Sequence, residues 1–145
     1  MTSNCLGNPL TETHCELNLH QLIDQLLVTF LPRAVRQNSI ILNQVQQELP
    51  VVTDKNVLAS VLGNLIYNTV ALTTNNCIKV SAKTYSNVTL IHIRKDDFCY
   101  EEEIEKSFQP IQALAEKLGG CISVSSSESK GTTVTFTFLN LAGAA

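Results

Sequence analysis

Two asparagines spaced four residues apart are the first candidates for a functional site. Asn64 and Asn68 lie in the run V-L-G-N-L-I-Y-N-T-V (61–70), whose apolar residues recur with a helical period. Side chains at positions i and i+4 of a helix are neighbours on one face, and these two flank the apolar stripe. Asparagine is a poor residue for a helix interior, so the pair needs an explanation. The two amides either belong to a binding site or are hydrogen-bonded at the rim of the core.

The remaining chemically capable side chains are more scattered. Asp96 and Asp97 follow a strand pattern, and an exposed turn at the end of that strand also explains them. The five cysteines are odd in number and form no C-x-x-C pair, which favours free thiols over a zinc site or a disulfide framework. No chemical role is predicted for the three histidines, which are His14, His20 and His92.

Length and composition predict one globular domain. The chain has 145 residues, 44% of them hydrophobic, and a net charge of -3, which argues against a broad nucleic-acid surface. The N-terminal residues lack the features of a secretory signal, and no apolar run reaches the roughly 20 residues that span a bilayer. We therefore expect a cytoplasmic protein without direct membrane contact, although a fragment of a membrane receptor would look the same. Residues 1–15 are predicted to be a tail or linker remnant, 16–140 the domain and 141–145 a C-terminal tail.

Hydrophobic periodicity predicts helices and strands in alternation. Asn18 and Gln21 resemble a capping box that opens a helix, which Pro32 should kink or break. Asp54 should start a second helix, and Pro110 should separate a short helix from a longer one. One-sided strands and amphipathic helices together indicate a two-layer α/β sandwich with helices on one face. The expected strands are 16–19, 39–44, 78–85, 88–94, 121–126 and 132–139. The first expected helix ends at about 36, and two later ones cover 56–72 and 111–118.

At this point the chain resembles the ATP-binding domain of histidine kinases, in the superfamily that also includes gyrase and mismatch-repair ATPases. The resemblance spans about 17–139 and is carried by the asparagine helix, by the strands leading to Lys95-Asp96-Asp97, and by the segment 115–138 with its G-G and K-G-T-T turns. It implies a mixed, mostly antiparallel sheet. It also implies that Asn68 is the Mg²⁺ ligand beside a bound triphosphate, a role that suits an amide oxygen. Thr132, after Gly131, matches the threonine that stands near the adenine-binding aspartate of the family.

The sequence departs from the family where nucleotide should bind. Ala71 replaces the basic residue that meets phosphate, and no glycine occurs between Gly63 and Gly119, although the family has a lid and a glycine loop there. Strict strand spacing places Lys95 in the position of the adenine-binding aspartate, whereas a slip of one residue places Asp96 there. Residues 107–110 resemble the segment before the lid and 111–114 the helix after it, so the lid is predicted to be deleted.

These observations predict a degenerate domain that acts as a signalling interaction module with weak or no ATP binding. No cofactor is expected, except ATP with Mg²⁺ if the pocket works. The alternative is the ATP-binding catalytic domain of a sensor histidine kinase, and an anti-sigma-like regulator also stays open. The domain is not expected to be catalytic alone, and no catalytic residue is assigned. Expected partners are another protein or an upstream kinase dimerisation domain, with a homodimer left open and no nucleic acid. The candidate nucleotide-binding residues are Asn64, Asn68, Asp96, Gly131 and Thr132, with Asn68 as the metal ligand.

Overall fold

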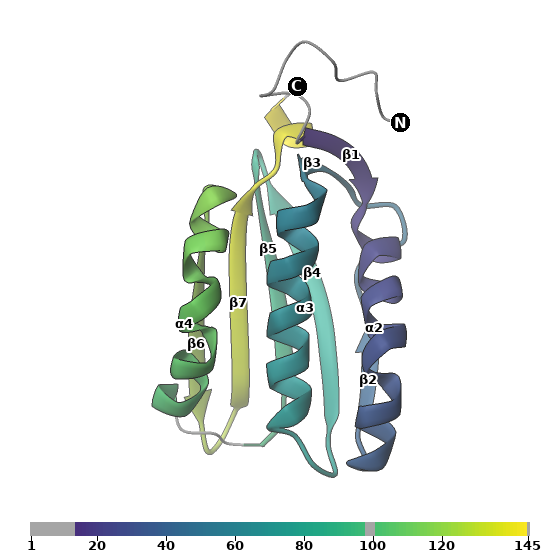
Figure 1. Ribbon diagram of the computed structural model, residues 1–145, viewed down its shortest axis with the longest axis vertical. Coiled ribbons are helices and arrows are strands. Elements are labelled where there is room, and N and C mark those ends of the chain that lie inside the picture. The colour runs from purple at the N-terminus through teal and green to yellow at the C-terminus, as the bar shows by residue number, and fades with distance from the viewer. Residues whose placement is uncertain (1–13, 98–100, 145) are drawn as a thin grey trace.

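The computed structural model describes residues 14–97 and 101–144. Strands and helices alternate along the chain, and helices α2, α3 and α4 run side by side (Figure 1). The elements are β1 (His14–Asn18), α2 (Leu19–Arg36), β2 (Ile40–Asn43), β3 (Pro50–Asp54), α3 (Lys55–Ala71), β4 (Cys77–Tyr85), β5 (Val88–Lys95), α4 (Glu101–Lys117), β6 (Cys121–Ser127), β7 (Gly131–Leu139) and the 3-10 helix η2 (Leu141–Ala144).

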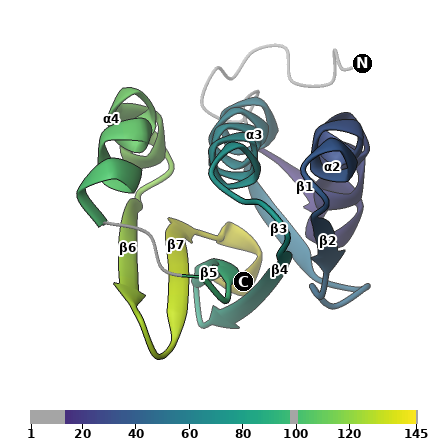
Figure 2. The same ribbon diagram turned by 90° about the horizontal axis from the view of Figure 1, so that it is seen from below.

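A five-stranded sheet in the order β2-β4-β5-β7-β6 forms one layer, and the three helices form the other (Figure 2). β2 pairs with β4 in parallel, and the other three pairings are antiparallel. Alternate strand residues point toward the helices and build the core, among them Ile91, Ile93, Val134 and Phe136. The predicted two-layer sandwich with a mixed, mostly antiparallel sheet is confirmed.

Local signals set the helix starts. The Asn18 side chain accepts a hydrogen bond from the Gln21 amide at 3.1 Å, and Asp54 caps α3 by accepting from the amides of Asn56 and Val57. Both starts agree with the capping residues predicted from the sequence, and each cap contributes about 1 kcal/mol.

The predicted helix breaks at Pro32 and Pro110 are wrong. Each proline lies inside one continuous helix, α2 and α4 respectively. A helical proline leaves the carbonyl four residues earlier without a donor. Here those carbonyls belong to Val28 and Lys106, and all four residues are exposed, so water can hydrate the unpaired groups.

A two-stranded sheet of β1 and β3 was not anticipated. β1 begins at His14, two residues earlier than the predicted start of the domain, and Pro50–Asp54 forms a strand where only a helix start was expected. The buried side chain of Asn140 joins this small sheet to β5. Its oxygen accepts from the Val52 and Ala142 amides at 3.0 Å each, and its nitrogen donates to Pro50 O at 3.2 Å and Thr89 Oγ1 at 3.0 Å.

The ends of the predicted domain also take up regular structure. Residues 141–144, expected to be a tail, form the 3-10 helix η2, and residues 1–13 lie outside the described part of the chain. Within the described ranges, no helix combines the length and the apolar character that crossing a membrane requires.

Candidate functional site

The asparagine pair lies on the face of α3 that borders α4. Asn68 is half-buried, and its Nδ2 donates to the Ser107 carbonyl of α4 at 3.3 Å. Its Oδ1, the atom that would ligate a cation, accepts no hydrogen bond from any described residue. Asn64 is exposed one turn earlier, and its Nδ2 donates back to the Ser60 carbonyl at 2.8 Å. Asn68 therefore links two helices, and Asn64 bonds to its own helix.

The end of β5 meets the start of β7 beneath these helices. Lys95 is the direct partner of Thr132 in the antiparallel register. Thr132 is buried, and its Oγ1 donates to the Asp97 carbonyl at 2.9 Å and lies 2.8 Å from Ser126 Oγ. The register therefore places Lys95, and not Asp96, on the same inward face of the sheet as Thr132.

Gly131 allows this close approach of β7 to the end of β5. Its φ is +77°, and a Cβ at this position would lie 2.3 Å from the Lys95 carbonyl oxygen. Both the positive φ and this close contact exclude a side chain at position 131. The glycine thus has a packing role in the structure, whether or not a ligand binds nearby.

Lys95 turns inward and is 3% exposed. Its Nζ donates to the Leu72 carbonyl at the end of α3 at 2.9 Å and lies 3.4 Å from Asp97 Oδ1. That oxygen is buried and makes no hydrogen bond within the described structure, so the contact is an ion pair without hydrogen-bond geometry. An ammonium group taken out of water is costly unless it is paired. These two contacts hold the lysine in place.

Among the described residues, a small cavity lies between α3, α4 and the strand ends. It measures about 10 Å³, room for at most one water molecule. Ile104 and Phe108 reach the core from α4 and are 3% and 1% exposed. The cavity is lined by Thr69, Leu72, Ile93, Lys95, Ile104, Thr132 and Val134.

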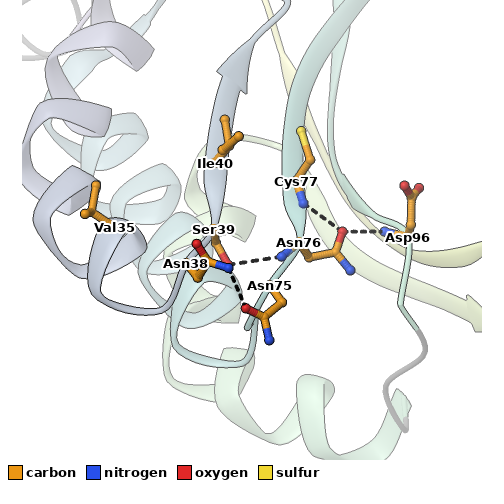
Figure 3. A pocket seen from close by; sticks show the side chains of 8 residues that line it. All are labelled: Val35, Asn38, Ser39, Ile40, Asn75, Asn76, Cys77 and Asp96. Carbon is orange, nitrogen blue, oxygen red and sulfur yellow. Dashed lines mark hydrogen bonds between the residues drawn. The ribbon is translucent and has the colours of Figure 1, made fainter.

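Asp96 lies elsewhere, at a wide polar depression of about 670 Å³ between the end of α2 and the loop before β4 (Figure 3). The backbone amide of Asp96 donates to Asn76 Oδ1 at 3.4 Å, and Asn38 bonds to Asn75 across the depression at 2.7 Å. The structure therefore brings Asn68, Gly131 and Thr132 to one end of the helix–sheet interface and leaves Asp96 outside it. Asn64 is on the same helix, one turn away from Asn68.

Helix α4 covers the segments on either side of the predicted lid deletion. Residues 101–117 form one helix, so the segments 107–110 and 111–114 are consecutive turns of it. Phe98, Cys99 and Tyr100 lie outside the described residues, as does Cys5. Cys15, Cys77 and Cys121 are free thiols, and the described residues contain no cluster of His, Cys, Asp and Glu that could hold a metal ion.

Sequence reasoning could not decide the role of Lys95. A lysine at a strand end is usually exposed, but this one faces inward beside its strand partner Thr132. The available signal was the strict two-residue alternation of β5, in which Ile91, Ile93 and Lys95 share a face.

No protein-family model matches the sequence, and no curated protein matches it. Solved structures of histidine kinases do match. Histidine kinase AdeS of Acinetobacter baumannii superposes with a TM-score of 0.77 at 17% identity, over 88% of this chain and 67% of that one. The nucleotide-free catalytic domain of histidine kinase ThkA gives 0.76 at 21%, over 88% and 95%.

ThkA in complex with the response regulator TrrA gives a TM-score of 0.76 at 21% identity, over 91% of this chain and 43% of that one. This chain therefore spans less than half of that longer kinase chain. The domain has the fold of a histidine kinase catalytic domain, as the sequence resemblance implied.

Proposed function

We propose that this domain is an interaction module built on the histidine kinase ATPase fold, with weak or no binding of ATP. The observation that carries the proposal is the burial of Lys95 beside Thr132, at the position where the resemblance, read with strict strand spacing, implies that the family recognises adenine. The adenine amino group is a hydrogen-bond donor and needs an acceptor, whereas an ammonium group offers only donors. The adenine amino group would face the ammonium group of Lys95, so two donors would meet without an acceptor. The packed surroundings also leave the charged side chain no space to move away.

The packing around Lys95 supports the same proposal. Adenine would have to displace side chains from a space with about 10 Å³ free. Moving Lys95 would break its bond to the Leu72 carbonyl and its contact with Asp97. Moving Phe108 or Ile104 would expose core surface, at about 1.5–3 kcal/mol for each large apolar side chain. Few ligand contacts remain to offset these costs, because the described chain offers no glycine loop and no basic residue at position 71.

A second candidate function is the ATP-binding catalytic domain of a sensor histidine kinase. The fold likeness to catalytic domains favours it, and so does the oxygen of Asn68, which is free to accept a cation. In that case the side chains at the cavity would rearrange when nucleotide binds. Asn68 would ligate Mg²⁺, and transfer of the γ-phosphoryl group would depend on positioning and on that ion.

Isothermal titration with Mg²⁺–ATP and Mg²⁺–ADP separates the two functions. The interaction-module proposal predicts no dissociation constant tighter than about 100 μM, which corresponds to about 5.5 kcal/mol. A tighter constant that is lost in Asn68→Ala and kept in Asn56→Ala would establish the catalytic reading instead. The Asn56 variant is a matched control, because it removes the same kind of side chain from an exposed position in the first turn of the same helix.

The physiological partner of this module is proposed to be a protein. A kinase dimerisation domain and a response regulator both belong to this class, and the ThkA structure contains a response regulator bound to a kinase of the same fold. Pull-down of the domain with purified candidates of each class, with and without Mg²⁺–ATP, tests the proposal. Binding that strictly requires nucleotide would contradict it.

A further inference from the structure

The five-stranded sheet presents a second face, away from the helices, that no described helix or strand covers (Figure 2). Strand alternation places one set of side chains on this open face, and they are exposed or half-buried, in contrast to their buried neighbours. Its central positions are Lys79, Ser81 and Lys83 of β4, Leu90, His92 and Arg94 of β5, Thr133, Thr135 and Thr137 of β7, and Cys121, Ser123 and Ser125 of β6.

The open face is positively charged although the chain is acidic overall. The five strands contain no Asp or Glu, while the whole chain has a net charge of -3. Lys79, Lys83 and Arg94 are exposed, and none of them forms an ion pair with a carboxylate in the described part of the chain. The strands themselves thus carry no carboxylate, and the nearest one in sequence is the exposed Asp96, just beyond the end of β5.

Lys79 and Arg94 lie directly opposite each other on adjacent strands. Like charges in this arrangement repel and destabilise the sheet. The pKa of the neighbouring His92 is lowered by burial and then by the positive charges of Lys83 and Arg94. An anion seated over β4 and β5 would relieve this repulsion.

Hydroxyl groups surround the basic residues. Six of the twelve central positions are serine or threonine, which can donate to carboxylate oxygens without adding charge. Aromatic platforms for stacked bases, which single-stranded nucleic acids need, are missing from these positions. Phe136 and Phe138 are buried on the helix side, and Tyr85, which shares the open face, is a single exposed ring at the far end of β4. The face suits carboxylates better than bases.

We propose that the open face of the sheet, centred on Lys79, Lys83 and Arg94, docks an acidic segment of a partner protein. The inference rests on the proposed interaction role and adds the surface and the chemistry of the partner. It does not depend on the filled space around Lys95, which lies on the helix side of the sheet.

A fluorescein-labelled oligoglutamate of about eight residues is a suitable probe, because about six extended residues cross five strands spaced about 4.8 Å apart. Fluorescence anisotropy at low salt compares the native chain with the triple variant Lys79→Gln, Lys83→Gln, Arg94→Gln. The matched control is Lys55→Gln, Lys106→Gln, Lys117→Gln, three exposed residues on the helix layer, with the same change of net charge. Circular dichroism verifies that both variants fold.

The face variant is expected to weaken probe binding about tenfold or more, the control less than about twofold, and salt near 1 M to abolish binding. Backbone NMR shifts of the native chain should concentrate on β4 and β5, which maps the site even if the variant folds poorly. The proposal is overturned by equal losses in both variants, by absence of probe binding, or by tighter binding of an oligothymidylate of equal charge. None of these outcomes would alter the ATP titration, so the two proposals fail separately.

Discussion

Replacing Phe108 with alanine tests whether α4 is part of the core or a removable cover over a nucleotide site. Phe108 is 1% exposed, and Ile104 and Ile111 flank it on the same helix face at 3% and 5%. Fully burying a phenylalanine side chain contributes about 1.5–3 kcal/mol, and the cavity left by truncation adds a further cost. Measured losses for Phe→Ala in cores are about 3–5 kcal/mol. Phe108→Ala should therefore remove a large part of a total stability of about 5–15 kcal/mol.

Urea unfolding followed by circular dichroism measures this loss as a lower midpoint at an unchanged slope. Gln109→Ala is the matched control, because the next residue of α4 is exposed and its replacement should change stability by no more than about 0.5 kcal/mol. A loss below about 1 kcal/mol for Phe108→Ala would refute the reasoning. It would mean that α4 packs loosely enough in solution to vacate the space beside α3.

Four further substitutions test separate features. Gly131→Ala should cost about 2 kcal/mol or more in urea unfolding, because its Cβ would collide with backbone at a φ of +77°; a neutral result would contradict that geometry. Asn140→Ala should cost about 2–4 kcal/mol by the same assay, since the four hydrogen bonds of a buried side chain are lost; a loss under about 1 kcal/mol would show that Asn140 holds the β1–β3 sheet only weakly. Burial and then nearby cations lower the pKa of His92, so the unfolded chain binds more protons than the folded one near that pKa. The free energy of unfolding should therefore fall as pH drops below the ordinary histidine value. His92→Gln should make this dependence of stability on pH shallower, and an identical dependence would refute the assignment. Lys79→Glu should stabilise the fold by a few tenths of a kcal/mol at low salt by turning a repulsive pair with Arg94 into an attractive one, whereas destabilisation would contradict the register.

The sequence was sufficient for elements whose causes are local. The caps at Asn18 and Asp54 and the alternation in β5 and β7 all depend on neighbours a few residues away. Such patterns fix where an element starts and which face it buries. They predicted the sandwich and the helical segments, apart from the breaks at Pro32 and Pro110, without any knowledge of long-range contacts.

The misses have non-local causes. Strand β3 exists because Val52 and its neighbours pair with β1, more than thirty residues earlier in the chain. Pro32 and Pro110 stay within helices because packing of the apolar face outweighs one missing hydrogen bond on the exposed face. Neither effect is visible in a window of a few residues.

The candidate site was only partly predictable for the same reason. Asn68 stood out by its spacing in a helix, but whether Lys95 or Asp96 faces inward depends on which residue of β7 pairs with the end of β5. A shift of one residue sends a strand side chain to the opposite face. The pairing with Thr132 turns the lysine inward and leaves the aspartate in the outer depression.

The hydrogen bonds that join Asn140 to β3 have a consequence for how the chain folds as it is synthesised. Its partners Val52 and Pro50 precede it by 88 and 90 positions, so β3 emerges from the ribosome long before the residue that secures it. Until Asn140 is synthesised, the Val52 amide and the Pro50 carbonyl lack the side chain that they bond in the folded protein. Contacts of such large sequence separation form slowly, so we expect the β1–β3 sheet to reach its final packing late in folding. A stalled or shortened nascent chain would leave this sheet without the Asn140 hydrogen bonds.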